Sequence, residues 1–342
     1  MTDILLTDRT TIETDWTCGM KRWWYKEYGG KGIVPTVEAA YFLDGRQYHE
    51  DFALLSSAID VLATAQDHIN AIMASVLNTP DQLFQETQTR RAGWMAANAL
   101  FFEPFTRLHY DTVDVEWELI LDRTPLWIAV TPDRVLRRKS DGALIYRDYK
   151  GVGGWGVTSA WLNSWPYAVQ IHTVLKAIEE ELDEPVAFGQ IVGLSKGQNK
   201  DGKLRHPYVW AYVDDNGEGW TSEWKYGLTL RPTWEYPGGI LEWVKQLGQS
   251  EVDAQFPHSQ KVFLNERLLD KLVAERTARE LDISTGQAMY ESRFSECSPS
   301  IGSPCPYLAA CHNAAVNTDP LGSGLYVVRT PHHDVEAIMK EE

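Results

Sequence analysis

The chain has 342 residues, of which 44% are hydrophobic. That length is enough to bury a substantial core, as one large elaborated domain or as two modest ones. The net charge of -16 argues against a protein that coats nucleic acid with its whole surface, because such proteins are usually basic. Any contact with DNA must therefore be local.

No apolar stretch is long enough to cross a bilayer: the longest runs are short, such as residues 119–121 and 126–130. The first residues also lack a basic region followed by an apolar one. We therefore expect a cytoplasmic protein without a membrane partner. Neither repeats nor low-complexity tracts are found, which excludes solenoids and propellers.

The first part of the chain is predicted to be helical. Apolar residues recur at helical spacing over residues 45–77, and Thr79-Pro80-Asp81 closes this helix. A second helix is predicted over residues 82–100.

From Val113 onwards the apolar pattern becomes that of strands. The predicted strands are residues 113–121, 126–136, 144–150, 186–194 and 208–213. Lys139-Ser140-Asp141-Gly142 predicts a hairpin turn between two of them.

Further helices are predicted over residues 161–182, 240–247 and 262–281. This order of elements predicts an α/β fold with a central sheet. We divide the chain into an N-terminal segment with a helical region, a core of sheet and helix, and a C-terminal region. Their bounds are residues 1–110, 111–235 and 236–342.

Two carboxylates and a lysine stand close together in the predicted sheet. Asp133 follows Thr131-Pro132 near the end of one strand, and Asp148 and Lys150 lie in the next. Because side chains alternate along a strand, Asp148 and Lys150 share one face and Tyr149 points to the other. Carboxylates on strands are suitable ligands for Mg²⁺ or Mn²⁺.

Such a group can hydrolyse a phosphodiester bond. The metal activates a water and neutralises charge on the phosphate, and the lysine stabilises the transition state. The alternative is a surface ion pair, which is the usual role of a single Asp-x-Lys. The upstream Pro132-Asp133, the hairpin and the apolar strands favour the nuclease interpretation.

The stretch VEWELILDRTPLWIAVTPDRVLRRKSDGALIYRDYKGV resembles the core of the PD-(D/E)xK nuclease superfamily, in its RecB-like branch. The resemblance implies a restriction-endonuclease-like central mixed sheet flanked by helices. It also implies that Asp133, Asp148 and the backbone carbonyl of Tyr149 bind Mg²⁺ or Mn²⁺, and that Lys150 is the catalytic lysine.

Two further motifs of that branch can be compared. Gly45-Arg46-Gln47-Tyr48-His49 matches Gly-x-x-x-His, which implies that His49 is a metal ligand rather than an ordinary helix histidine. A later helix carries Gln-x-x-x-Tyr in the branch, and here Gln170 is followed by Val174. Gln170 is the implied active-site glutamine, and Tyr167 could replace the missing tyrosine.

Basic residues cluster directly after Asp133. Arg134, Arg137 and Arg138 are candidates for contacts with DNA, and Tyr167 is another. The alternative is that these arginines belong to an ordinary solvated surface.

The four cysteines lie at the two ends of the chain: Cys18 stands alone, and Cys297, Cys305 and Cys311 follow late in a stretch rich in proline. In a cytoplasmic protein they favour a metal site, or reduced buried thiols, over disulfides. From the spacing alone, zinc and an iron-sulfur cluster fit equally.

This arrangement resembles the iron-sulfur nucleases of the same branch, which include the AddB-type and the CRISPR-associated adaptation nucleases. The resemblance implies a 4Fe-4S cluster that joins the N- and C-terminal segments, although the spacing before Cys305 is longer than the usual one.

Aromatic residues gather next to Cys18, at Trp23, Trp24, Tyr25 and Tyr28. Interleaved with basic residues, they could form a stacking platform for single-stranded nucleic acid. They could equally shield a metal cluster.

The sequence therefore predicts a Mg²⁺- or Mn²⁺-dependent deoxyribonuclease, expected to be an exonuclease on DNA ends or single strands. Its expected partners are DNA and a recombination, helicase or CRISPR adaptation protein. The alternative is a non-catalytic DNA-binding or scaffold protein with the same fold and cysteine site.

Overall fold

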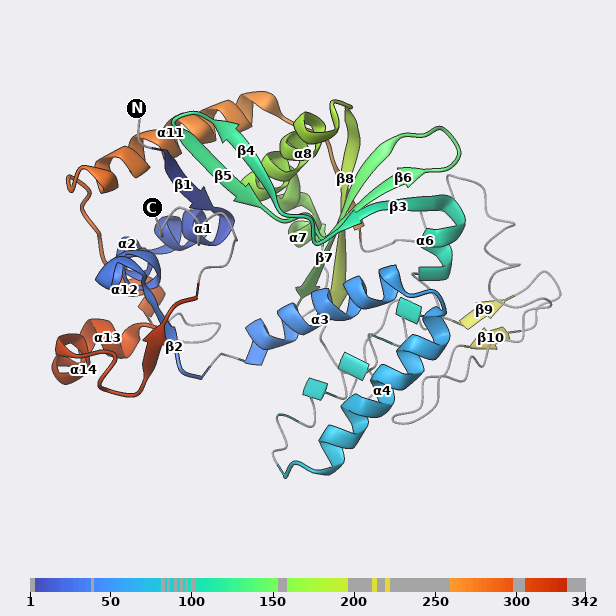
Figure 1. The fold of residues 1–342 in the computed structure, drawn as a ribbon, viewed down its shortest axis with the longest axis horizontal. Helices are drawn as coiled ribbons and strands as arrows, with labels where there is room; N and C mark the ends of the chain where they lie inside the picture. The colour runs from blue at the N-terminus through green and yellow to red at the C-terminus, as the bar shows by residue number, and fades with distance from the viewer. Residues whose placement is uncertain are drawn as a thin grey trace.

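The computed structural model describes residues 4–37, 40–80, 84, 87–88, 91–92, 95, 98–99, 103–152, 159–195, 211–213, 219–221, 259–297 and 305–330. Within these residues the chain is a mixed α/β protein with two main sheets and helices packed around them (Figure 1). The predicted fold class is confirmed at this level.

The larger sheet has five strands in the order β11-β8-β7-β6-β3. They are β3 (Tyr110–Val115), β6 (Arg134–Arg138), β7 (Leu144–Val152), β8 (Val186–Ser195) and β11 (Ser259–Val262). β7 and β8 are parallel and the other neighbours are antiparallel. The sheet is therefore mixed, as expected.

The smaller sheet has the order β1-β5-β4, with β1 parallel to β5 and β4 antiparallel to it. Its strands are β1 (Leu5–Asp8), β4 (Leu119–Arg123) and β5 (Leu126–Val130). The N-terminal segment thus adds a strand beside the strands of the predicted core.

Two strands predicted as single elements each divide between the two sheets. Residues 113–121 form the end of β3 and the start of β4, and residues 126–136 form β5 and most of β6. Pro132 has no backbone N–H and cannot donate a hydrogen bond to a neighbouring strand. Glu116 has a left-handed φ of 50°, which does not fit an extended strand. Glu116 and Asp133 therefore both lie where the chain passes from one sheet to the other.

Helices cover both faces of the larger sheet (Figure 1). α8 (Val169–Leu182) packs on one face, where Ile171 and Leu175 approach Gly189 beside Tyr146. On the other face, Phe52 of α3 (Ala40–Ser57) contacts the ring of Tyr149 at 4.5 Å between centroids.

Three predicted helices have different bounds, each for a local reason. The helix over 45–77 divides into α3 and α4 (Val61–Leu77), because Asp60 caps α4 by accepting from the Ala63 N–H at 3.0 Å. The helix over 161–182 divides into α7 (Ser159–Ser164), a 3-10 turn η4 (Trp165–Tyr167) and α8, where Pro166 interrupts the helical path.

The helix predicted over 262–281 starts later, because Val262 belongs to β11. Asn265 caps α11 (Glu266–Ser284) by accepting from Leu268 N–H. The helix predicted over 82–100 lies mostly outside the described residues, and residues 240–247 lie wholly outside them. Of the strand predicted over 208–213, only β9 (Ala211–Val213) is described, paired with β10 (Gly219–Thr221).

The two ends of the chain meet in several contacts. β2 (Ile33–Pro35) pairs antiparallel with β12 (Tyr326–Val328). Arg22 forms a buried bidentate pair with Glu280 of α11, at 2.7 and 2.6 Å. The remaining elements of this region are α1 (Arg9–Thr17), α2 (Gly19–Arg22), η1 (Trp23–Glu27), η2 (Tyr28–Gly30), α12 (Phe294–Cys297), α13 (Leu308–His312) and α14 (Ala314–Thr318).

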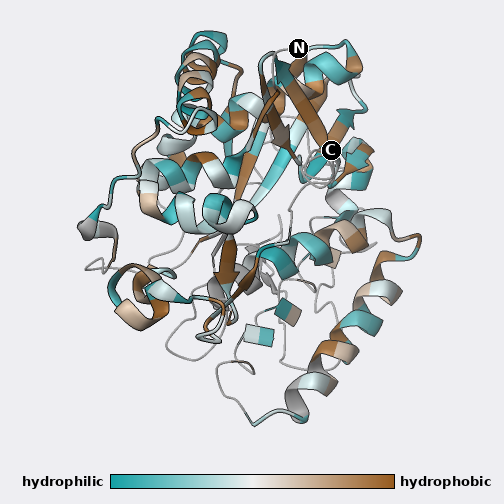
Figure 2. Ribbon diagram, turned by 60° about the vertical axis from the view of Figure 1, so that its left-hand side comes forward, coloured by the Kyte–Doolittle hydropathy of each residue, from teal (hydrophilic) through white to brown (hydrophobic). Residues whose placement is uncertain are grey.

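The main core lies between the two sheets and the helices α8 and α11, and it holds the most hydrophobic strand segments (Figure 2). Its members include Leu121, Ile128, Leu144, Tyr146, Ile171, Leu175, Ile191 and Leu272. None of the described helices is long and apolar enough to span a membrane.

Candidate metal centre

Three potential metal ligands from distant parts of the chain meet beside the larger sheet. His49 of α3, Glu116 after β3 and Asp133 before β6 each place a ligand atom within 4.8 Å of the other two. His49 Nδ1 lies 3.2 Å from Asp133 Oδ2 and 3.8 Å from Glu116 Oε1. One nitrogen and two carboxylates suit Mn²⁺ and are tolerable for Mg²⁺.

Backbone pairing holds the two carboxylates in place. The Tyr149 N–H donates to Asp133 Oδ2 at 2.8 Å, and the Glu116 N–H donates to the Asp133 carbonyl at 3.2 Å. The register of β3 and β6 pairs Val115 with Arg134, so Glu116 comes opposite Asp133. The centre is thus built at the junction of the two sheets.

Asp148 and Lys150 lie beside these ligands on β7. Lys150 Nζ is 2.6 Å from Asp148 Oδ1, and the Asp148 side chain is fully buried. Lys150 pairs with Asp148 Oδ1, and Asp148 Oδ2 accepts no well-formed hydrogen bond from a described residue. One oxygen of this buried carboxylate is therefore left for a cation or for a water bound to it.

The two aspartates have opposite pKa shifts. Burial opposes the charged form of Asp133, but His49 and Lys150 outweigh burial and hold its pKa well below the usual range. Burial, followed by repulsion from Asp133, raises the pKa of Asp148 to about 7. Two carboxylates that share one site shift each other's pKa in this way.

Glu116 and His49 respond to the same charges. Burial and Asp133 raise the pKa of Glu116 to about 7, although 39% of its side chain is exposed. Burial lowers the pKa of His49, but attraction to Asp133 outweighs it, so the net shift is upward. The site is an acidic group that favours a bound cation.

The ligand set differs from the expected one in two respects. Asp148 lies outside the group of three, and Glu116 takes a place in it. The Tyr149 N–H donates a hydrogen bond to Asp133. The metal-binding role expected of the Tyr149 carbonyl stays a prediction. Gly45, in α3, has open space where a Cβ would lie, so crowding does not require glycine there.

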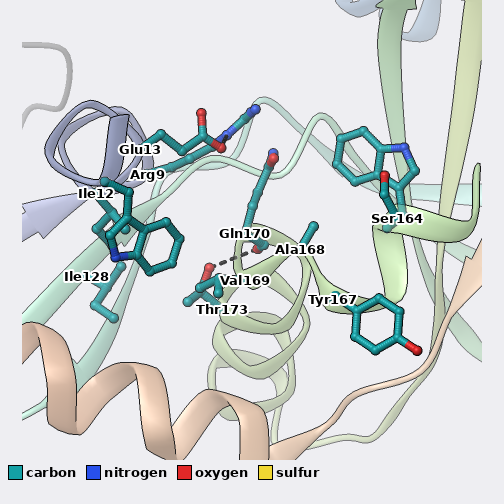
Figure 3. A pocket seen from close by; sticks show the side chains of 12 residues that line it. Arg9, Ile12, Glu13, Ile128, Ser164, Tyr167, Ala168, Val169, Gln170 and Thr173 are labelled. Atoms are coloured by element: carbon teal, nitrogen blue, oxygen red, sulfur yellow. Dashed lines mark hydrogen bonds and ion pairs between the residues drawn. The ribbon is translucent and has the colours of Figure 1, made fainter. Parts of the chain in front are cut away.

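Gln170 lies at the start of α8 and lines a pocket between α1 and α8 (Figure 3). Its Oε1 is buried and has no hydrogen-bond partner among the described residues. Val174, where the branch carries tyrosine, is buried in the core. The expected role of Gln170 at the metal stays a prediction.

The arginines expected at DNA are engaged in ion pairs. Arg134 is buried and pairs with Glu103 of α6 (Glu103–His109) at 2.6 and 3.0 Å, so its guanidinium is not presented to a ligand. Arg137 pairs with Glu184. The expected DNA contact of Arg134 stays a prediction, and its burial by a partner 31 residues away weighs against it.

The other three positions from that expectation remain accessible to different degrees, and the Arg137 side chain is 39% exposed. Arg138 pairs with Asp141 and is 15% exposed, whereas Tyr167 is 78% exposed. Of the four candidates, Tyr167 is the side chain best placed to contact a ligand.

Sequence reasoning missed Glu116. Glu116 directly follows β3, and its place beside Asp133 depends on the pairing of β3 with β6. Treating residues 113–121 as one strand hid it, because the position then falls inside a strand.

The four cysteines lie in one region, and none forms a disulfide. Burial raises the pKa of Cys305 and of Cys311, and the other cysteines contribute in the same direction. The Cys305 N–H donates to the Cys297 carbonyl at 3.0 Å, and Arg293 N–H lies 3.5 Å from Cys18 Sγ. The fold therefore brings Cys18 to the C-terminal trio.

The aromatic cluster beside Cys18 packs inwards. Trp24 is 1% exposed and donates its Nε1–H to Cys311 Sγ at 3.2 Å. Trp23, Tyr25 and Tyr28 pack around the same small core as partly buried residues. The structure favours the shielding role over the stacking platform for this cluster, most clearly at Trp24.

Comparisons with known proteins assign no family. A scan against protein-family models finds no match for this chain, and a search of curated proteins finds no related protein.

Proposed function

We propose that this protein is a metal-dependent deoxyribonuclease that hydrolyses phosphodiester bonds with Mg²⁺ or Mn²⁺. The observation that carries the proposal is the group of His49, Glu116 and Asp133, with ligand atoms within 4.8 Å of one another and Asp148 and Lys150 alongside. A bound divalent ion would lower the pKa of a water and neutralise charge on the scissile phosphate.

Each residue has a role that follows from its position. His49, Glu116 and Asp133 would hold the ion, and Asp148 would hold either the ion or a water bound to it. Lys150 would carry positive charge to the non-bridging oxygens of the phosphate, from a position fixed by its ion pair with Asp148. Burial keeps Asp148 and Lys150 away from bulk water, which strengthens their interactions.

We further propose that the fold is the restriction-endonuclease-like one and that the four cysteines bind a structural metal centre. The resemblance to the iron-sulfur nucleases of the RecB-like branch favours a 4Fe-4S cluster, and tetrahedral zinc on the same four thiolates is the alternative. Anaerobic purification with an absorption spectrum and metal analysis distinguishes iron-sulfur, zinc and no metal.

The negative net charge fits a nuclease that acts at DNA ends or on single strands with the help of a recombination, helicase or CRISPR adaptation protein. Extensive duplex binding would require a broad basic surface.

Cleavage assays test the enzyme proposal. End-labelled single-stranded, linear duplex and circular DNA are incubated with Mn²⁺ and the wild-type protein, Lys150→Ala or Lys139→Ala. Wild type and Lys139→Ala are expected to degrade linear substrates, because Lys139 lies on the hairpin turn and pairs with Asp111. Lys150→Ala should lose at least about 100-fold in rate, as removal of a transition-state contact does.

If the wild type and Lys150→Ala both leave all three DNA substrates intact, the protein is not this nuclease. The alternative of a non-catalytic DNA-binding or scaffold protein would then account for the fold.

A further inference from the structure

A second feature, separate from the metal ligands, lies between α1 and the start of α8. It is a pocket of about 300 Å³, a size at the lower end of small-ligand sites. Trp16 of α1, Trp165 and Tyr167 of η4, and Gln170 of α8 contribute to its wall (Figure 3).

Aromatic side chains give this pocket flat surfaces. Trp16 is 36% exposed and Tyr167 is 78% exposed, so both rings are open to a ligand. The Trp16 ring is held in position, because its Nε1–H donates to Glu275 at 3.4 Å and the Arg276 guanidinium lies 4.9 Å from its centroid. A fixed ring loses little freedom when a base stacks on it.

Two buried polar atoms of the lining residues have no partner among the described residues. Gln170 Oε1 is an acceptor, and Trp165 Nε1–H is a donor. An unpaired buried polar group carries a desolvation cost, which a ligand with matching groups would relieve once the side chain turns that atom towards the pocket. The Watson–Crick edge of a base presents donors and acceptors side by side.

The charge of the pocket favours an uncharged ring over a phosphate. Among the described residues that line it, Arg9 and Glu13 are the charged ones, and they pair with each other at 2.8 Å. In Figure 3 the Gln170 side chain extends towards this pair, while Tyr167 lies on the other side of the α8 start. The net charge of the wall is therefore close to zero.

The pocket lies within reach of the metal centre along the chain. Ile128 lines the pocket and Asp133 follows five residues later, so their Cα atoms are at most about 18 Å apart. A strand passing the metal centre could therefore place a neighbouring base at the pocket.

We propose that this pocket binds an unpaired nucleobase of a DNA strand whose backbone lies at the metal centre. This inference rests on the proposed nuclease function and names its substrate class as single-stranded DNA or an unpaired end. A base held in a pocket cannot remain in a duplex stack.

Binding measurements on the full chain test the pocket without relying on cleavage. The probe is a fluorescein-labelled single-stranded hexathymidylate, with a labelled blunt duplex as comparison, and the protein is Lys150→Ala in the presence of Mn²⁺. Adding Trp16→Ala or Tyr167→Ala should weaken single-strand binding by about tenfold, the value of one lost stacking contact. Trp16→Phe, which keeps an aromatic ring, should restore most of the affinity.

Phe263→Ala is the matched control, because Phe263 is an exposed aromatic residue, 65% accessible, that does not line the pocket. It should leave the affinity unchanged. Tyr167→Ala is the variant expected to fold normally, because this exposed side chain contributes little to the core. A loss of binding in this variant would therefore not result from unfolding.

Unchanged single-strand affinity in both Trp16→Ala and Tyr167→Ala would overturn the pocket proposal, as would an equal loss for the blunt duplex. The two proposals can fail separately. If the wild type does not cleave DNA but single-strand binding still depends on Trp16 and Tyr167, only the nuclease function is wrong. If it cleaves DNA and binding is insensitive to both residues, only the pocket assignment is wrong.

Discussion

At the scale of single residues, the site is defined by charge that the folded chain cannot neutralise well without a cation. Asp133 and Asp148 are close enough to shift each other's pKa in opposite directions, and Glu116 adds a third carboxylate. His49 and Lys150 offset part of this charge. A divalent ion is the group that would offset the rest.

The first prediction concerns Glu116, which only the structure places at the site. Glu116→Gln should weaken Mn²⁺ binding by about 10- to 100-fold, a range seen when groups that support a metal site are lost. Isothermal titration calorimetry measures it. Asp111→Asn is the control, because Asp111 is an exposed acid on β3 that pairs with Lys139. Equal affinity for Glu116→Gln and the wild type would remove Glu116 from the ligand set.

The second prediction concerns stability without metal. The pKa of Asp148 is raised from 3.8 to about 7, so the folded protein binds this proton more tightly than the unfolded chain and loses stability as the pH rises through that window. Asp148→Asn removes the free-energy cost of ionising this buried carboxyl group. Each pKa unit corresponds to about 1.4 kcal/mol, so at pH 8 the metal-free variant should melt several degrees higher than the wild type.

Calorimetry of both proteins in chelator measures this difference. The same variant should gain less stability from Mn²⁺ than the wild type does. A lower melting temperature for metal-free Asp148→Asn would show that the buried carboxylate stabilises the fold.

At the scale of elements, the sequence predicted where strands and helices occur, but it did not predict where long predicted elements break into shorter ones. Alternation and β-branched residues located β7 and β8 within one or two residues. The breaks at Asp60, Pro166 and Asn265 follow ordinary capping and proline rules, but continuous apolar spacing on either side masked them.

The same limit applies to the candidate site. Asp133, Asp148 and Lys150 stand near one another in sequence, so their proximity could be predicted. Glu116 depends on the β3–β6 register, and the burial of Arg134 depends on a partner in α6. Long-range pairings of this kind leave no periodic signal in the chain.

The third prediction concerns the contact between α2 and α11. Removal of one partner from a buried ion pair costs about 3–5 kcal/mol, because it strands the other charge. Arg22 is 1% exposed but keeps Glu27 as a partner at 3.2 Å, so Glu280→Gln should destabilise the protein by an amount at the lower end of this range. Glu180→Gln breaks the comparable but more exposed pair with Arg123 and should cost about 0–1 kcal/mol.

Urea denaturation of the two variants provides the comparison. Similar midpoints for Glu280→Gln and Glu180→Gln would mean that the α2–α11 pair does not hold the two ends together.

At the scale of the whole molecule, two kinds of contact join the two ends of the chain. They are the β2–β12 pairing and the ion pairs between the N-terminal helices and α11, and the proposed metal centre at the cysteines would add a third. Fixing residues so far apart in sequence restricts the unfolded chain. The metal centre near the sheets and the cysteine region are separate sites, consistent with a structural role for the second.

The fourth prediction tests that role. Cys18→Ser should lower both the bound iron or zinc and the melting temperature of the whole protein, because Cys18 is the one cysteine supplied by the N-terminal segment. Metal analysis and calorimetry on anaerobically purified protein measure the two effects together. Full metal content with unchanged melting would exclude Cys18 from the centre.

The central claim is that a divalent ion binds where the two sheets meet. Crystals grown with Mn²⁺ and examined by anomalous diffraction at the manganese edge test this claim most directly. We predict an anomalous peak bonded to His49, Glu116 and Asp133, with Asp148 beside it. A structure with Mn²⁺ in the crystal solution and no peak at these residues would contradict the account.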